Sequence, residues 1–189
     1  MNNKITDKTM REVRDCFASA LNDEKKGKKH KGLLITKPDN QMAEKYIKKA
    51  RLNLELCDLY KERGFDYKIP EEWFYTLYYC ALAVLSKFGI ESRSQKCTAY
   101  FLKYAKKDNL ISYDDEFIER IMVYRDKEES SDVDERERAR YSSSIKSKEI
   151  ESRYKSMMSV CKKAISQAEE IIYSDKELKI PQELVKGEQ

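Results

Sequence analysis

Residues 70–88 read "PEEWFYTLYYCALAVLSKF", and this stretch decides the fold class. It is apolar on nearly every side, it opens with a proline and two glutamates, and Gly89 follows it. Proline suits the first position of a helix, acidic side chains favour its start and glycine favours its end. A helix that is apolar all round has to be surrounded by other helices. We therefore predict that this segment is the central helix of a bundle.

The composition agrees with a helical bundle. A chain of 189 residues is long enough for one domain with a real core. Only 5 Gly and 3 Pro occur in it, which argues against an all-β fold with many turns. Charged residues make up 38% of the chain, but the net charge is only +4. A nucleic-acid site would therefore have to be a local basic patch.

Apolar residues recur at helical spacing on both sides of the central segment. The other helices that we expect are residues 7–22, 41–62 and 93–107, a fifth helix that Ser112 caps and a last helix that Ser147 caps. Asp39 or Asn40 would cap the helix over 41–62, and Ser92 or Ser94 the one over 93–107. The segment "LLIT" is too short to classify.

These segments predict an all-α fold, an antiparallel bundle of four to five main helices plus an N-terminal helix. We divide the chain into an N-terminal helix and basic loop over residues 1–40, a bundle over 41–175 and a flexible tail over 176–189.

The cysteines are odd in number and widely spaced, and no CxxC motif occurs. They are Cys16, Cys57, Cys80, Cys97 and Cys161. Neither a disulfide framework nor a zinc site is expected, and buried free thiols in a reducing cytoplasm fit better. The N-terminus has no apolar signal core, and the most apolar run, residues 73–85, is too short to span a bilayer. We expect a cytoplasmic protein with no membrane partner.

The loop "KKGKKHKG" at residues 25–32 combines the only histidine, His30, with a cluster of lysines. In a loop we expect the imidazole to be solvated rather than to act as a general base, and no second His or paired Cys would complete a metal site. The lysines could meet the phosphates of RNA or form a solvated linker. They are Lys25, Lys26, Lys28, Lys29 and Lys31.

The tyrosines of the central helix could stack on bases, but core packing is the preferred interpretation. The sequence has no Gly-rich phosphate loop, no serine nucleophile elbow and no kinase signature. We predict neither a metal nor a cofactor.

Residues 73–104 read "WFYTLYYCALAVLSKFGIESRSQKCTAYFLKY" and contain an ordered set of features. These are an aromatic pair with a small residue, an Ala-rich apolar run, a Gly-Ile-Glu step and the start of a new helix. In this chain they are Phe74-Tyr75-Thr76, the run after it, Gly89-Ile90-Glu91, and Ser94-Gln95. The set resembles the HEPN family of small helical-bundle proteins, in which Ser-His is common where Ser94-Gln95 stands here. The resemblance covers about residues 41–173.

The resemblance implies a bundle that usually forms dimers and is often encoded beside a minimal nucleotidyltransferase. Many HEPN proteins are metal-independent ribonucleases with an Arg followed, after four to six residues, by a His. In these enzymes the Arg holds the scissile phosphate and the His moves protons. The stretch "RERARY" has Arg136, then four residues, then Tyr141. Another candidate, Arg125, leads only to Ser130.

Tyr141 stands where the family's His is expected, and a tyrosine with a pKa of about 10 is a poor general base near neutral pH. Gln95 cannot move protons either. We therefore interpret this stretch as a vestigial or repurposed phosphate site. Its basic residues are Arg136, Arg138 and Arg140.

Three hypotheses follow from the sequence. The first is a non-catalytic HEPN-like protein of a toxin–antitoxin or defence system, which binds RNA through the arginines and the lysines or binds a partner protein. That partner would be a nucleotidyltransferase or a second copy of the chain. The second is a metal-independent endoribonuclease toxin that uses Arg136 and Tyr141. The third is a structural subunit that only assembles with others.

Overall fold

In the computed structural model of the chain, residues 2–122 and 147–185 are described, with the side chains of residues 8–122 and 148–185. The prediction of an all-α bundle is confirmed, with a small two-stranded sheet in addition. The elements are α1 (Asn2–Lys25), β1 (Leu33–Ile35), α2 (Asn40–Glu62), the short 3-10 helix η1 (Asp66–Lys68), α3 (Ile69–Phe88), β2 (Ile90–Ser92), α4 (Gln95–Lys107), α5 (Asp115–Ile121), α7 (Ser147–Ile172) and α8 (Gln182–Val185).

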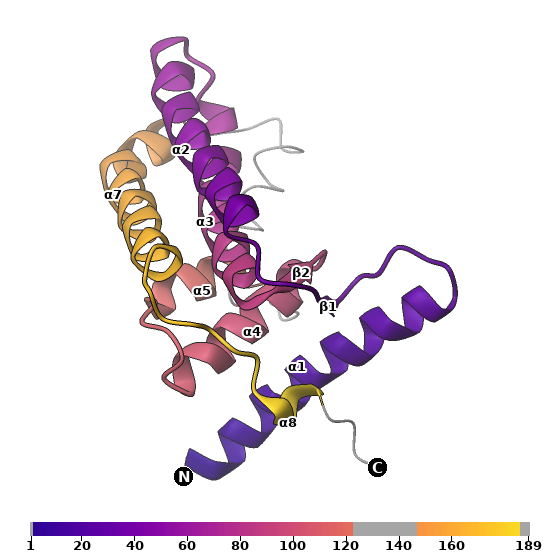
Figure 1. The fold of residues 1–189 in the computed structure, drawn as a ribbon. Helices are drawn as coiled ribbons and strands as arrows, with labels where there is room; N and C mark the ends of the chain where they lie inside the picture. Colours follow the sequence, from indigo (N-terminus) through magenta and orange to yellow (C-terminus); the bar gives the residue numbers. More distant parts are fainter. Residues whose placement is uncertain (1, 123–146, 186–189) are drawn as a thin grey trace.

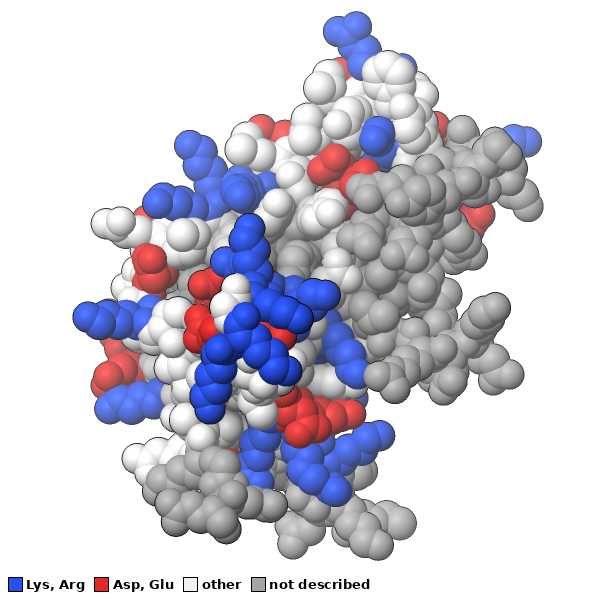
Figure 2. Space-filling model, turned by 90° about the vertical axis from the view of Figure 1, so that its right-hand side faces the viewer, with Lys and Arg blue, Asp and Glu red and all other residues white. Residues whose placement is uncertain are grey.

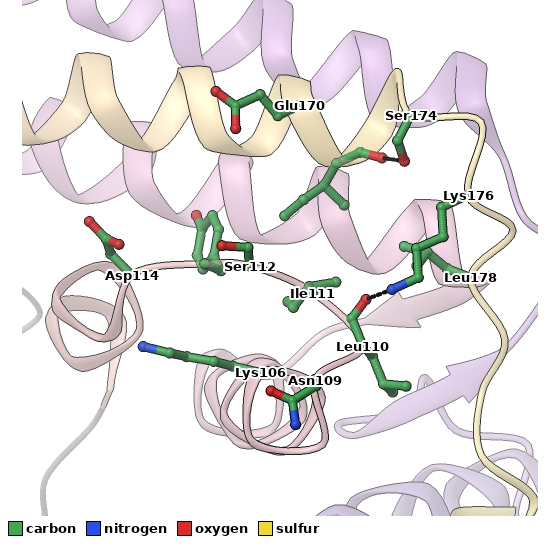
Figure 3. A pocket seen from close by; sticks show the side chains of 12 residues that line it. Lys106, Asn109, Leu110, Ile111, Ser112, Asp114, Glu170, Ser174, Lys176 and Leu178 are labelled. Carbon is green, nitrogen blue, oxygen red and sulfur yellow. Dashed lines mark hydrogen bonds between the residues drawn. The ribbon is translucent and has the colours of Figure 1, made fainter.

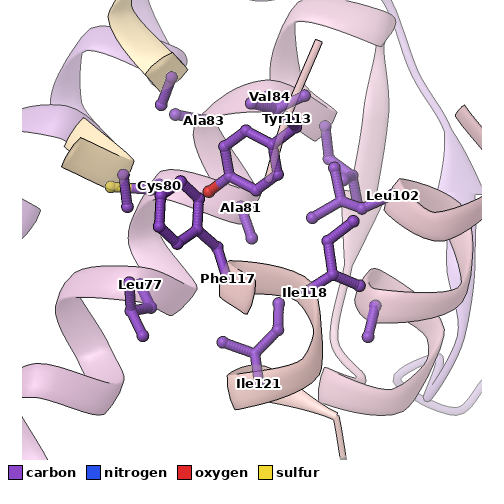
Figure 4. Close-up of a cluster of buried hydrophobic side chains, with 14 of the residues drawn as sticks. Leu77, Cys80, Ala81, Ala83, Val84, Leu102, Tyr113, Phe117, Ile118 and Ile121 are labelled. Carbon is purple, nitrogen blue, oxygen red and sulfur yellow. The ribbon is translucent and has the colours of Figure 1, made fainter. Parts of the chain in front are cut away.

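Helix α3 is the centre of the bundle, as its apolar sequence predicts. It packs against α2 and α7, which run beside it, and against α4 and α5 nearer its C-terminal end (Figure 1). Trp73 and Phe74 in its first half and Leu85 in its second half are all buried. Figure 4 shows the rings of Tyr113 and Phe117 among the side chains of α3, where they close one side of the core.

Side chains and one glycine set the helix ends. The Asp39 carboxylate accepts the N–H of Met42 at 2.8 Å and caps α2, and the Ser94 hydroxyl accepts the N–H of Cys97 at 3.3 Å and caps α4. Gly89 ends α3 with φ of 76° in the left-handed region, as predicted.

Four expected helix starts differ from the structure. Helix α1 begins at Asn2 and not at residue 7, and Ser147 is the first residue of α7 and not the residue before it. The other two are the starts of α4 and α5. Ile90–Ser92 form β2, so α4 begins at Gln95 and not at residue 93. The α5 helix begins at Asp115, after Asp114, and not directly after Ser112. Ser92 and Ser112 could each cap a helix, but extended residues follow them, Ser94 in the first place and Asp114 in the second.

The N-terminal segment lies across the end of the bundle at which α4 lies (Figure 1). Helix α1 packs against α4, β1 and α8. Strand β1 pairs antiparallel with β2, with Leu33 opposite Ser92 and Ile35 opposite Ile90. The sheet therefore joins the segment before residue 40 to the bundle after it.

A disulfide corrects our expectation that the cysteines are free thiols. Cys16 of α1 is bonded to Cys97 of α4, and their Cα atoms lie 5.8 Å apart. Both residues are buried. The two cysteines are 81 residues apart, and no spacing pattern in the sequence pairs them. They meet only because α1 packs against α4. Cys57, Cys80 and Cys161 are buried outside the disulfide.

The C-terminal segment that we expected to be flexible contains α8. Leu184 in this helix is buried, and the Arg14 side chain of α1 donates a hydrogen bond to the carbonyl of Glu183 at 2.7 Å. Within residues 2–122 and 147–185, no helix has the length and apolar character needed to cross a membrane.

Candidate functional site

The predicted lysines lie at the last residue of α1, Lys25, and in the connection that leads from α1 to β1, and hydrogen bonds hold the backbone of this connection. We call residues 25–31 the lysine loop. The carbonyl of Asp23 accepts the N–H of Lys28 at 2.9 Å, and the carboxylate of Asp23 accepts the N–H of Lys31 at 3.0 Å. Gly27 has φ of 65°, which a glycine adopts without strain. The loop therefore folds back onto the end of α1.

All five lysine side chains of the lysine loop are exposed. None of them forms an ion pair with a residue that the structure describes. Figure 2 faces the end of the molecule on which this loop lies, and Lys and Arg side chains gather near the centre of that view. The loop is thus a local basic patch on a chain of nearly balanced charge.

His30 is buried in the middle of this loop, with 5% of its surface exposed, so our expectation of a solvated imidazole is wrong. Its Nε2 lies 3.3 Å from Oε1 of Glu91 in β2. The backbone explains the burial, because Gly32 packs so closely on α1 that a Cβ there would collide with the carbonyl oxygen of Cys16. His30 thereby turns inward and attaches the loop to the sheet.

Glu91 joins His30 to a second basic residue. Arg93 donates from its Nε to the same Oε1 atom at 2.7 Å. Burial raises the pKa of the Glu91 carboxyl, but the hydrogen bonds from Arg93 and His30 lower it more, and the pKa lies below its ordinary value. Glu91 is therefore ionised at neutral pH, and Arg93 places an exposed guanidinium beside the lysine loop.

The arginine motif lies elsewhere in the chain. Its residues, Arg136, Arg138, Arg140 and Tyr141, are outside the described part of the structure. Gln95 is the first residue of α4 and is half-buried. The contact of the lysine loop with β2, through His30 and Glu91, could not be read from the sequence, because a strand of three residues shows no periodicity.

The preferred interpretation of the tyrosines as core residues is only partly right. Tyr75, Tyr78 and Tyr79 of α3 pack against the core, but they are only half-buried and also reach the surface. Their spacing of three and four residues, which puts them on one side of the helix, is the signal that sequence reasoning could have used.

A pocket of about 670 Å³ lies between the α4–α5 connection and the end of α7 (Figure 3). Its lysines already have partners. Lys106 lies 2.6 Å from Asp115, and the Lys176 ammonium donates to the carbonyl of Leu110 at 2.8 Å. The pocket therefore offers an anion less unpaired positive charge than the lysine loop does, and we assign no ligand to it.

Among the residues with described side chains, no three or more His, Cys, Asp and Glu residues are grouped so that they could hold a metal ion. A comparison of the chain with protein-family models, with curated proteins and with solved structures gives no match.

Proposed function

We propose that this protein binds RNA through the lysine loop without cleaving it, as a component of a toxin–antitoxin or defence system. The observation that carries the proposal is the set of five exposed lysines on a loop whose backbone is held by Asp23 and His30. Lysines neutralise phosphates and release counterions, which gives affinity without sequence preference. A backbone that is already ordered loses less entropy on binding than a free loop would.

We propose that the protein does not cleave RNA because no histidine is placed to transfer protons to or from the RNA. A general base has to come within hydrogen-bond reach of the 2′-hydroxyl that it deprotonates. His30 is the only histidine of the chain, and it is buried with Nε2 directed at Glu91. In the arginine motif, Tyr141 stands in the place of the family's histidine.

The resemblance to the HEPN family adds two proposed partners. One is a second copy of the chain, and the other is a minimal nucleotidyltransferase. Light scattering at increasing protein concentration tests the homodimer, because a particle that stays at the mass of one chain, 22.4 kDa, would contradict it.

We also propose a cytoplasmic location, which the disulfide makes testable. Structural disulfides persist in oxidising compartments and are rare in the cytosol. If the protein is cytoplasmic, Cys16 and Cys97 should be thiols in the cell, and alkylation directly after the cells are denatured in acid should modify both of them, whether or not the disulfide forms after purification. Complete protection of both residues in the denatured chain would instead indicate an oxidising compartment.

Binding to a fluorescently labelled single-stranded RNA, measured by anisotropy, tests the role of the lysine loop. The variant Lys28→Gln/Lys29→Gln/Lys31→Gln should bind at least tenfold more weakly than the unchanged protein, since three phosphate contacts are removed. The matched control, Lys103→Gln/Lys107→Gln/Lys155→Gln, changes the net charge equally at exposed positions of α4 and α7 and should keep its affinity. Equal losses in both variants would contradict a local site.

Incubation of the same RNA with excess protein and a metal chelator tests the absence of cleavage. The RNA should remain intact on a denaturing gel. Cleavage that Arg136→Ala abolishes would contradict the proposal and support the ribonuclease hypothesis.

A further inference from the structure

Three tyrosine rings of α2 and α3 lie in a row at the surface. The ring centroids of Tyr46 and Tyr79 are 6.0 Å apart, and those of Tyr79 and Tyr75 are 5.9 Å apart. Adjacent rings are inclined by only 20° and 28°, so their planes are nearly parallel. All three side chains are half-buried. We call these residues the tyrosine row.

A lysine lies over the tyrosine row. The Lys49 ammonium is 5.3 Å from the ring centroid of Tyr79 and 6.0 Å from that of Tyr46. Lys45 and Lys48 are exposed on the same helix. The hydroxyls of Tyr46 and Tyr79 make no hydrogen bond to a described residue. The surface thus combines aromatic rings with ammonium groups.

The tyrosine row lies close to the anchor of the lysine loop. Burial raises the pKa of Tyr46, and the negative charge of Glu91 raises it further, as expected for a nearby carboxylate. Glu91 is the residue that holds His30 and Arg93. Glu91 therefore contacts His30 and Arg93 and also lies near enough to Tyr46 to influence it electrostatically.

We infer that the tyrosine row is a stacking platform for the bases of single-stranded RNA whose phosphates contact the lysine loop. This inference rests on the proposed RNA binding and adds the class of RNA. Aromatic side chains that stack on bases beside a cationic surface are the usual means of holding single strands without sequence preference.

Duplex RNA does not fit this surface, because its bases are stacked on one another and present only their edges to a protein. A protein partner fits less well than RNA, because it would have to bring enough acidic groups to match Lys45, Lys48 and Lys49 as well as the lysine loop. A single strand supplies both the flat rings and the phosphates.

The test compares ring removal with ring conservation. Tyr46→Leu/Tyr79→Leu keeps an apolar side chain but removes both rings, and it should bind single-stranded RNA at least tenfold more weakly, since stacking contributes about 1–3 kcal/mol per base. Tyr46→Phe/Tyr79→Phe keeps the rings and should bind within about twofold of the unchanged protein, because only the hydroxyls are lost. The matched control is Tyr173→Leu, which removes an exposed ring at the end of the α7 region.

Binding of a duplex RNA of the same length separates stacking from other effects. The leucine variant should change duplex affinity little, and its circular dichroism and melting temperature should match those of the phenylalanine variant. An equal loss for duplex and single strand, or a loss in the phenylalanine variant as well, would overturn the stacking role.

A second measurement does not depend on whether a variant folds. Photo-crosslinking of the unchanged protein to single-stranded RNA with 5-iodouracil should place the modified base on Tyr46, Tyr75 or Tyr79. Crosslinks confined to other residues would overturn the inference. If the lysine variant loses affinity and the leucine variant does not, the RNA site stands and the stacking role fails. If neither variant loses affinity, the proposed RNA binding by the lysine loop is itself contradicted.

Discussion

The imidazole of His30 and the carboxylate of Glu91, 61 residues apart in the chain, meet at 3.3 Å between the lysine loop and strand β2. This contact joins a basic loop to the two-stranded sheet, so the loop should depend on it for order. We predict that His30→Ala increases the rate of trypsin cleavage within residues 25–31 about tenfold, since a hydrogen bond to a charged group contributes about 1.5–3 kcal/mol.

The control for this variant is His30→Gln, whose amide can still donate a hydrogen bond to Glu91. It should stay closer to the unchanged protein than His30→Ala in the trypsin experiment. Equal protection of the loop in all three proteins would show that the contact does not hold it.

Glu72, a half-buried residue in the first turn of α3, should make stability depend on pH. Burial, and secondarily the charge of Glu71, raise the pKa of its carboxyl to about 7. The folded state then holds a proton that the unfolded state has lost, so stability falls as the pH rises from about 4.5 to about 7.

Glu72→Gln removes this ionisation. The variant should raise the free energy of unfolding by about 1 kcal/mol at about pH 8 and change it little at about pH 4. The value of about 1 kcal/mol is reduced because the carboxyl is partly exposed to solvent. Urea denaturation measures both values. The exposed Glu119→Gln should stay within about 0.5 kcal/mol at either pH, and an effect of Glu72→Gln that is the same at both would refute the assignment.

Two glycines with similar backbone angles should respond differently to alanine. Gly89 has φ of 76°, and a Cβ there would lie 2.7 Å from the carbonyl oxygen of Thr36 and 2.8 Å from the nitrogen of Pro38. Gly27 has φ of 65° with no atom in the way. Gly27→Ala should cost about 1 kcal/mol from the left-handed backbone alone, and Gly89→Ala about 3 kcal/mol or more because backbone atoms must also shift. Similar costs from thermal denaturation would mean that the close approach at Gly89 is absent.

The Cys16–Cys97 disulfide should contribute to stability by restricting the unfolded chain. It closes a separation of 81 residues, for which the loop-entropy model gives about 4.5 kcal/mol. Reduction should lower the free energy of unfolding by up to that amount, and mass spectrometry after alkylation should find three modified cysteines before reduction and five after it. In Cys16→Ala/Cys97→Ala the reductant should have no effect, and five reactive thiols in the unreduced, unfolded protein would rule the disulfide out.

The helices could be predicted from the sequence because each carries its own signals. The run from Pro70 to Gly89 contains a start, an apolar interior and a stop, and the structure places α3 within one residue of the predicted bounds. Helix α2 was equally readable, since Asp39 precedes a regular apolar stripe.

Features that depend on distant residues could not be predicted in this way. Leu33–Ile35 becomes a strand only because Ile90–Ser92 lies beside it. The burial of His30 depends on β2, and the disulfide depends on the packing of α1 against α4. The lysines of the candidate site were found from the local sequence at residues 25–32, because charge is a property of the residues themselves, whereas their anchoring is a property of the fold.

The dependence of RNA affinity on salt tests the central claim most directly, because only phosphate contacts release counterions. Dissociation constants for one single-stranded RNA should be measured over a series of salt concentrations for the unchanged protein, the Lys28→Gln/Lys29→Gln/Lys31→Gln variant and the Lys103→Gln/Lys107→Gln/Lys155→Gln control. Each lost contact should lower the slope of log affinity against log salt by about 0.7, so the lysine-loop variant should lose about 2 while the control keeps the full slope. Identical slopes for all three proteins would contradict RNA binding by the lysine loop.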